Sequence, residues 1–95
     1  MPEMRFDIEW PDGSRESCYS PSLVIKDYLA PGQSYSLAEF LNLSRTALNI
    51  ASARVQAKFG FPCSRALGQL AKIEGTAARF SETGGDVRIL SFHDL

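Results

Sequence analysis

Residues 4–10 read Met-Arg-Phe-Asp-Ile-Glu-Trp, and their apolar and charged side chains alternate one by one. Because successive side chains of a strand point to opposite faces, this period of two predicts a β-strand with one face on a core. Pro11-Asp12-Gly13-Ser14 follows and predicts a tight turn, since proline fixes φ and glycine accepts a positive φ. Residues 15–19 then return as the second strand of a hairpin.

The register of this hairpin depends on the length of its loop, and the sequence leaves two alternatives. A three-residue loop places Cys18 opposite Phe6 on the apolar face, whereas a four-residue loop places Tyr19 there. A shift of one residue turns every side chain of a strand to the other face. We take the first register as the prediction and leave the second open.

Three helices are expected after the hairpin. Ser20-Pro21 predicts the start of a short helix that ends near Leu29, because serine caps helices and proline suits their first position. The segment Ser36-Leu37-Ala38-Glu39 has the spacing of a capping box and opens a long central helix. This helix is expected to reach Phe59 and to stop at Gly60.

A third helix and a last strand complete the prediction. Ser64 is the expected cap of this helix, residues 81–85 form a polar loop, and Val87–Phe92 form a strand that joins the N-terminal hairpin. The buried positions of the two long helices follow helical spacing. They are Leu37, Phe40, Leu41, Ala47, Leu48, Ala51, Val55 and Phe59 in the central helix, and Leu67, Leu70, Ile73, Ala77 and Phe80 in the third.

The order β-β-α-α-α-β predicts an α+β fold, with a small three-stranded sheet and helices packed on one of its faces. The chain has 95 residues, and we expect residues 1–95 to form a single domain. Its 10 basic and 11 acidic residues argue against nucleic acid as the main partner, since phosphate binding depends on clustered Lys and Arg.

Membrane and export functions are not expected either. No apolar run approaches the roughly 20 residues that a membrane span needs. The N-terminus carries acidic residues and lacks the basic-then-apolar order of a signal peptide. The two cysteines fit reduced thiols better than a disulfide framework, so the expected location is the cytoplasm.

The first candidate site is at the start of the third helix. Cys63 precedes this helix, where backbone amides and the helix dipole stabilise a thiolate, and Arg65 adds positive charge. Ser20 and Ser64 lie at expected helix starts, where amides and hydroxyls hold anions. A reactive thiol or anion site would thus use Cys63, Ser64, Arg65 and Ser20; the alternatives are a small buried cysteine and ordinary serine caps.

No metal, cofactor or catalytic residue is expected. Cys18, Cys63 and His93 lack the close pairs that mark zinc sites. A Ser or Cys nucleophile would need the same histidine, with Asp94 beside it rather than across from it. A binding protein is therefore favoured over an enzyme.

The second candidate is an interaction face on the third helix. Gly68, Ala71, Gly75 and Ala78 follow helical spacing and form a smooth stripe. A glycine inside a helix costs about 1 kcal/mol relative to alanine, so the close approach of another surface would account for the two glycines. That surface is either a protein partner or the central helix of the same chain. Pairing of this helix or a sheet edge with a second copy, as a homodimer, is a further alternative.

Several blocks of the sequence occur together in a known family: Met1–Phe6, Trp10–Gly13, Cys18–Ser22, Val24–Leu29 and Gly60–Leu67. With them, the chain resembles a small bacterial family named for a mycobacterial nitrogen-starvation-response protein. The similarity runs from Met1 to about Phe80.

The resemblance implies a place in bacterial gene clusters beside a nitrilase, a radical SAM-type protein, an acetyltransferase and a flavin-dependent oxidoreductase. Such clusters are linked to the use of nitriles or cyanide as a nitrogen source. The resemblance carries no activity and no catalytic residue to this chain. We therefore expect a small cytoplasmic accessory or regulatory protein that binds a protein partner, for instance an enzyme of such a cluster. The alternative is a small-molecule-binding protein or a thiol-dependent enzyme that uses Cys63.

Overall fold

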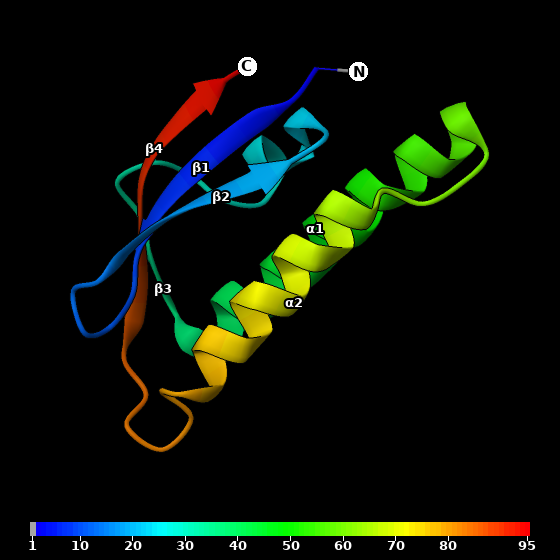
Figure 1. Cartoon of the computed structure of the whole chain (residues 1–95). Helices are drawn as coiled ribbons and strands as arrows, with labels where there is room; N and C mark the ends of the chain where they lie inside the picture. Colours follow the sequence, from blue (N-terminus) through cyan, green and yellow to red (C-terminus); the bar gives the residue numbers. More distant parts are fainter. Residues whose placement is uncertain (1) are drawn as a thin grey trace.

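A four-stranded antiparallel sheet lies against two long helices in the computed structural model, which describes residues 2–95 (Figure 1). The strand order in the sheet is β2-β1-β4-β3. Met1, where the family resemblance begins, lies outside the described residues. The elements in chain order are β1 Met4–Glu9, β2 Arg15–Ser20, the 3₁₀ helix η1 Leu23–Asp27, β3 Ser34–Ser36, α1 Leu37–Phe59, α2 Ser64–Ala78 and β4 Asp86–Asp94.

The N-terminal hairpin forms in the first of the two predicted registers. Phe6 of β1 pairs with Cys18 of β2, and both side chains are fully buried. Trp10 N donates a 2.8 Å hydrogen bond to Ser14 O, so three residues form the loop between them. Gly13 has φ +86°, the left-handed conformation that the turn was expected to need.

The sheet has four strands, and the expected three-stranded sheet is wrong. The additional strand, β3, pairs with residues 86–88 of β4. Two further backbone bonds extend this pairing, from Gly32 N to Ile89 O and from Ile89 N to Gln33 O. Because β4 also pairs with β1, the last strand of the chain lies in the interior of the sheet.

The first expected helix is a short 3₁₀ helix, so the order β-β-α-α-α-β is also wrong. The 3₁₀ helix covers only Leu23–Asp27, and its N-cap is Ser22 rather than Ser20. The Ser22 hydroxyl accepts a 3.3 Å hydrogen bond from Val24 N. Ile25 is fully buried, so this short element contributes to the core despite its length.

The two long helices begin and end close to where the sequence predicts. Ser36 Oγ accepts a 3.2 Å hydrogen bond from Glu39 N at the start of α1, as the capping box predicts. Gly60 ends this helix with φ +87°. The helix α2 begins at Ser64, but its N-cap is Cys63, whose side chain makes no capping bond, so the prediction of Ser64 as the cap is wrong.

The core lies between the sheet and the helices. Trp10 packs edge-to-face on Phe40 of α1, with ring centroids 5.7 Å apart, and is stacked on Phe80 at 6.0 Å. Most of the predicted buried positions are confirmed, but Phe59 and Leu67 are exposed. Phe59 ends α1, at the end of the hairpin that lies beyond the sheet (Figure 1). Leu67 lies on α2 between Arg65 and Gln69, which both contact Tyr19 of β2, so it is exposed because it is on the outward side of that helix.

Within residues 2–95, no helix is both long and apolar enough to span a bilayer.

Candidate functional site

Cys63, Ser64 and Arg65 lie together at the turn that joins α1 to α2. The Cys63 thiol is partly buried, and the backbone N–H of this residue donates a 3.3 Å hydrogen bond to Ser52 Oγ. The Arg65 guanidinium lies over the Tyr19 ring, 3.8 Å from its centroid. Arg65 thereby ties the start of α2 to the end of β2.

Ser20, the fourth residue of the predicted anion site, uses its hydroxyl within its own turn. It is fully buried, and its Oγ donates to Ser22 O at 2.7 Å and accepts from Ser22 N at 3.2 Å. Arg54 Nη1 donates to Ser22 Oγ at 2.9 Å. These bonds stabilise the chain reversal before η1, while use of the residue in anion binding remains a prediction.

The stripe of small residues on α2 faces outward. Gly68, Ala71, Gly75 and Ala78 are all exposed, whereas Leu70, Ile73 and Ala77 form the buried side of the same helix. A Cβ added at either glycine would meet no atom within 4 Å. The stripe therefore does not pack on α1, and intramolecular packing does not account for its glycines.

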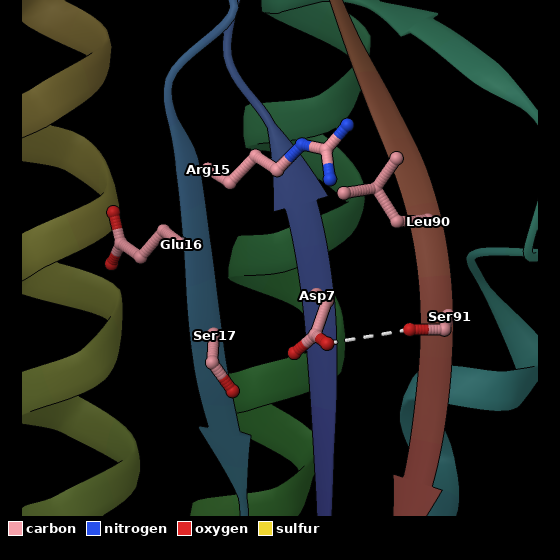
Figure 2. Close-up of a pocket in the computed structure, with 6 residues that line it drawn as sticks. All are labelled: Asp7, Arg15, Glu16, Ser17, Leu90 and Ser91. Atoms are coloured by element: carbon pink, nitrogen blue, oxygen red, sulfur yellow. Dashed lines mark hydrogen bonds between the residues drawn. The ribbon is translucent and has the colours of Figure 1, made fainter.

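A polar pocket of about 330 Å³ lies on the face of the sheet that is turned away from the helices (Figure 2). Asp7 stands at its centre, between Ser17 of β2 and Ser91 of β4. The neighbouring Glu16 side chain points toward α2 (Figure 2), and it accepts a 3.1 Å hydrogen bond from Trp10 Nε1. The residues that line the pocket are Asp7, Arg15, Glu16, Ser17, Leu90 and Ser91.

Asp7 forms a cluster with Ser91 and His93. His93 Nε2 lies 2.9 Å from Asp7 Oδ2, and Ser91 Oγ lies 3.3 Å from the same oxygen and 3.1 Å from the same ring nitrogen. Burial alone would raise the pKa of the Asp7 carboxyl. The nearby Ser17 hydroxyl, the hydrogen bonds from His93 and Ser91, and the charge of His93 together lower this pKa below its usual value.

The geometry of this cluster differs from a nucleophile relay. In a relay, one imidazole nitrogen faces the hydroxyl and the other faces the carboxylate. Here a single nitrogen, His93 Nε2, faces both Asp7 and Ser91. The arrangement is suited to holding the carboxylate in place and to binding polar groups, rather than to activating the serine.

Sequence reasoning missed this cluster because it compared His93 with Cys18, Cys63 and Asp94, and not with the outward face of the first strand. The available signal was the outward face of the first strand, on which the alternation places Asp7. Pairing of the last strand with the first then brings His93 opposite Arg5 and Ser91 opposite Asp7. The register of that pairing could not be read from the sequence.

The two cysteines lie in different environments. Cys18 is buried in the core, and burial raises the pKa of its thiol. A raised pKa disfavours the Cys18 thiolate. Cys63 is only partly buried, so its thiol is the more accessible of the two. Among the described residues, no three His, Cys, Asp or Glu side chains are grouped so as to hold a metal ion.

Comparison with known proteins places the chain in a family. Neither a curated protein nor a solved structure matches it. A family model does match, over most of the strands and both long helices. The chain belongs to the family described as nitrogen starvation-induced protein NitG, whose model covers residues 5–92.

Proposed function

We propose that this protein is a small accessory or regulatory protein of the nitrogen starvation response and acts by binding a protein partner. The family description supports the link to nitrogen starvation. The resemblance to proteins of nitrilase gene clusters supports a bacterial, cytoplasmic setting and a partner among the enzymes of nitrile or cyanide use. The proposed partner is one such enzyme.

The outward stripe of α2 is the observation that carries this proposal. Gly68 and Gly75 lie inside a helix with ordinary backbone angles and with open space around the missing Cβ. Each costs about 1 kcal/mol of helix stability relative to alanine. A partner whose backbone approaches the helix closely would explain why glycine stands at both positions.

Small-molecule binding is the second candidate function. The pocket beside Asp7 supports it, because serine hydroxyls and a fixed carboxylate converge on a hollow of about 330 Å³. A thiol-dependent reaction at Cys63 is a separate form of this alternative, supported by the partial exposure of that residue.

Affinity capture tests the main proposal. Tagged protein is used as bait in cells grown on a nitrile as the nitrogen source, and the captured proteins are identified by mass spectrometry. Gly75→Arg blocks the stripe, while Ala53→Arg adds the same charge at an exposed position of α1. We expect stoichiometric recovery of one cluster enzyme by the wild type and by Ala53→Arg, and its loss with Gly75→Arg.

Recovery of the bait alone by the wild-type protein would contradict the proposal. The mass of the purified protein in solution then decides between the remaining alternatives. A dimer would favour a homo-oligomeric module, whereas a monomer would direct attention to the pocket beside Asp7 and to Cys63.

A further inference from the structure

The far end of the α1–α2 hairpin exposes apolar side chains. Phe59 is 54% exposed, Phe61 66% and Leu67 41%, and all three lie within or beside the turn between the helices. Figure 1 shows this turn at the end of the hairpin that is remote from the sheet. We refer to residues 54–67 as the hairpin tip. Single exposed apolar residues are common on proteins, but a group of them marks an interaction site.

The same part of the chain has an unbalanced charge. Residues 46–73 contain four basic residues and no acidic residue, whereas the rest of the chain contains six basic and eleven acidic residues. The four are Arg54, Lys58, Arg65 and Lys72, and all are exposed. Residues 46–73 therefore carry a net positive charge, and the rest of the chain carries a net negative charge.

Most of this positive charge is not neutralised within the chain. In residues 2–95, only Lys72 of the four lies within ion-pair distance of a carboxylate, 3.8 Å from Glu16. Arg54 bonds to a serine hydroxyl, while Lys58 and Arg65 lie over the aromatic rings of Phe59 and Tyr19. Arg54, Lys58 and Arg65 therefore have no carboxylate partner among residues 2–95 and are available to pair with acidic groups of another molecule.

We infer that the hairpin tip binds an acidic, apolar surface of the partner protein, an inference that rests on the proposed partner-binding function. Phe61 would fill an apolar pocket of that partner, and Lys58 and Arg65 would face Asp and Glu side chains at its rim. Aromatic anchors surrounded by complementary charge are typical of protein–protein binding sites.

The charge distribution favours a protein over nucleic acid or a membrane as the occupant. Both of these present extended negative surfaces, which attract long stripes or patches of Lys and Arg. Here only four of the ten basic residues lie in the stretch without acidic residues, and the acidic excess of the remaining chain would repel such a surface. An acidic patch of limited size on a protein could contact the basic residues of the hairpin tip without approaching the acidic remainder of the chain.

Site-specific photocrosslinking in nitrile-grown cells tests the inference. A photoreactive phenylalanine analogue replaces Phe61 in one version of the full chain and Leu95 in another. Leu95 is a matched control, because it is 65% exposed, close to the exposure of Phe61, and lies outside the hairpin tip. We expect position 61, and not position 95, to crosslink to a protein segment rich in Asp or Glu and in apolar residues.

Charge reversal supplies the second readout. Lys58→Glu combined with Arg65→Glu should lower the yield of this crosslink by about tenfold or more, because like charges would then face each other. The control pair Arg79→Glu and Arg88→Glu changes the net charge equally outside residues 46–73 and should leave the yield unchanged. Circular dichroism of each variant verifies that it is folded.

Four results would overturn the inference: a crosslink to nucleic acid, to lipid, to a second copy of this chain, or to a protein segment without acidic residues. An undiminished yield in the charge-reversed variant would do the same. If affinity capture recovers a partner that position 61 does not reach, the tip is the wrong surface while the proposed function stands. If affinity capture recovers nothing, the proposed function itself fails.

Discussion

Two buried serines on α1 differ in whether their hydroxyl groups have a partner. Ser44 is fully buried, and its Oγ has no hydrogen-bond partner among residues 2–95. Ser52 is 5% exposed, and its Oγ accepts the hydrogen bond from Cys63 N. A buried polar group without a partner costs roughly 1–3 kcal/mol, whereas a satisfied one contributes about 1 kcal/mol.

Alanine substitution at these two positions should therefore act in opposite directions. Ser44→Ala should raise the free energy of unfolding by about 1 kcal/mol, and Ser52→Ala should lower it by about the same amount. Urea denaturation followed by circular dichroism measures both changes. Equal destabilisation by the two variants would show that the Ser44 hydroxyl has a partner in solution.

Asp7 should make stability depend on pH in the acidic range. Its pKa in the folded chain is below the usual value of 3.8, because the nearby Ser17 hydroxyl and the hydrogen bonds from His93 and Ser91 outweigh the effect of burial. The folded state therefore favours the ionised carboxylate. The resulting stabilisation is complete above this usual, unfolded-state value and is lost as the pH falls through the lower folded pKa.

Asp7→Asn tests this dependence. At pH 7 the variant should be less stable than the wild type by about 1 kcal/mol, the typical contribution of such hydrogen bonds. The difference should shrink as the pH falls below 4, because the wild-type carboxylate then becomes protonated as well. Asp27→Asn, at an exposed position of η1, is the control. A difference that stays constant down to pH 2 would contradict the role given to Asp7.

At the scale of elements, α2 combines a stable buried side with an outward side that weakens the isolated helix. Gly68→Ala and Gly75→Ala should each stabilise the free protein by about 1 kcal/mol, since alanine is the better helix former and meets no atom there. If the partner approaches the stripe closely, the same variants should reduce its recovery in affinity capture. For each substitution, thermal denaturation should therefore show a higher stability, while affinity capture should show a lower recovery of the partner.

Gly84→Ala is the matched control for these variants. Gly84 also has open space around its missing Cβ, but its φ is +67°, which strains other residues. We expect this substitution to destabilise the protein and to leave recovery of the partner unchanged. If Gly68→Ala and Gly75→Ala are stabilised and still recover the partner fully, the two glycines do not contribute to partner binding.

Local signals account for the elements that the sequence predicts correctly. The Met4–Trp10 alternation, the Ser36 cap and Gly60 each specify structure through neighbouring residues, and the structure confirms the strand and both ends of α1. The strand Ser34–Ser36 has no such signal, because three polar and aromatic residues become a strand only through pairing with β4. The short helix was predicted too long because Ser20-Pro21 has the composition of a helix start, while the buried Ser20 hydroxyl stabilises a turn instead.

For the whole molecule, the sequence reveals helix faces but not what covers them. Phe59 and Leu67 follow the helical spacing of core residues, yet both are exposed. Phe59 is exposed because α1 extends past the sheet (Figure 1), and Leu67 because it lies on the outward side of α2. The Asp7 cluster depends on contacts between residues more than 80 positions apart, for which the sequence carries no local pattern. The candidate residues Cys63, Ser64 and Arg65 were predicted from local sequence, and their part in binding remains to be tested.

The position of β4 leads to a prediction about the entire fold. This strand pairs with β1 and with β3, and it buries Val87 and Ile89 completely. A chain that stops at Gly85 would lose both pairings and two core side chains. Each buried aliphatic side chain contributes roughly 1.5–3 kcal/mol, and a small domain has only about 5–15 kcal/mol of net stability.

We therefore expect a chain ending at Gly85 to be unfolded by circular dichroism and by amide dispersion in nuclear magnetic resonance spectra. A chain ending at His93 is the control, since it keeps Val87, Ile89 and the bond between His93 and Asp7. It loses only Asp94 and Leu95, including the exposed ion pair between Lys26 and Asp94, which is worth at most about 1 kcal/mol. Native-like spectra from the shorter chain would mean that the hairpin and the two helices fold without the strand that joins β1 to β3. In that case the pairing of β1 with β4 would serve mainly to assemble the Asp7 cluster rather than to hold the fold together.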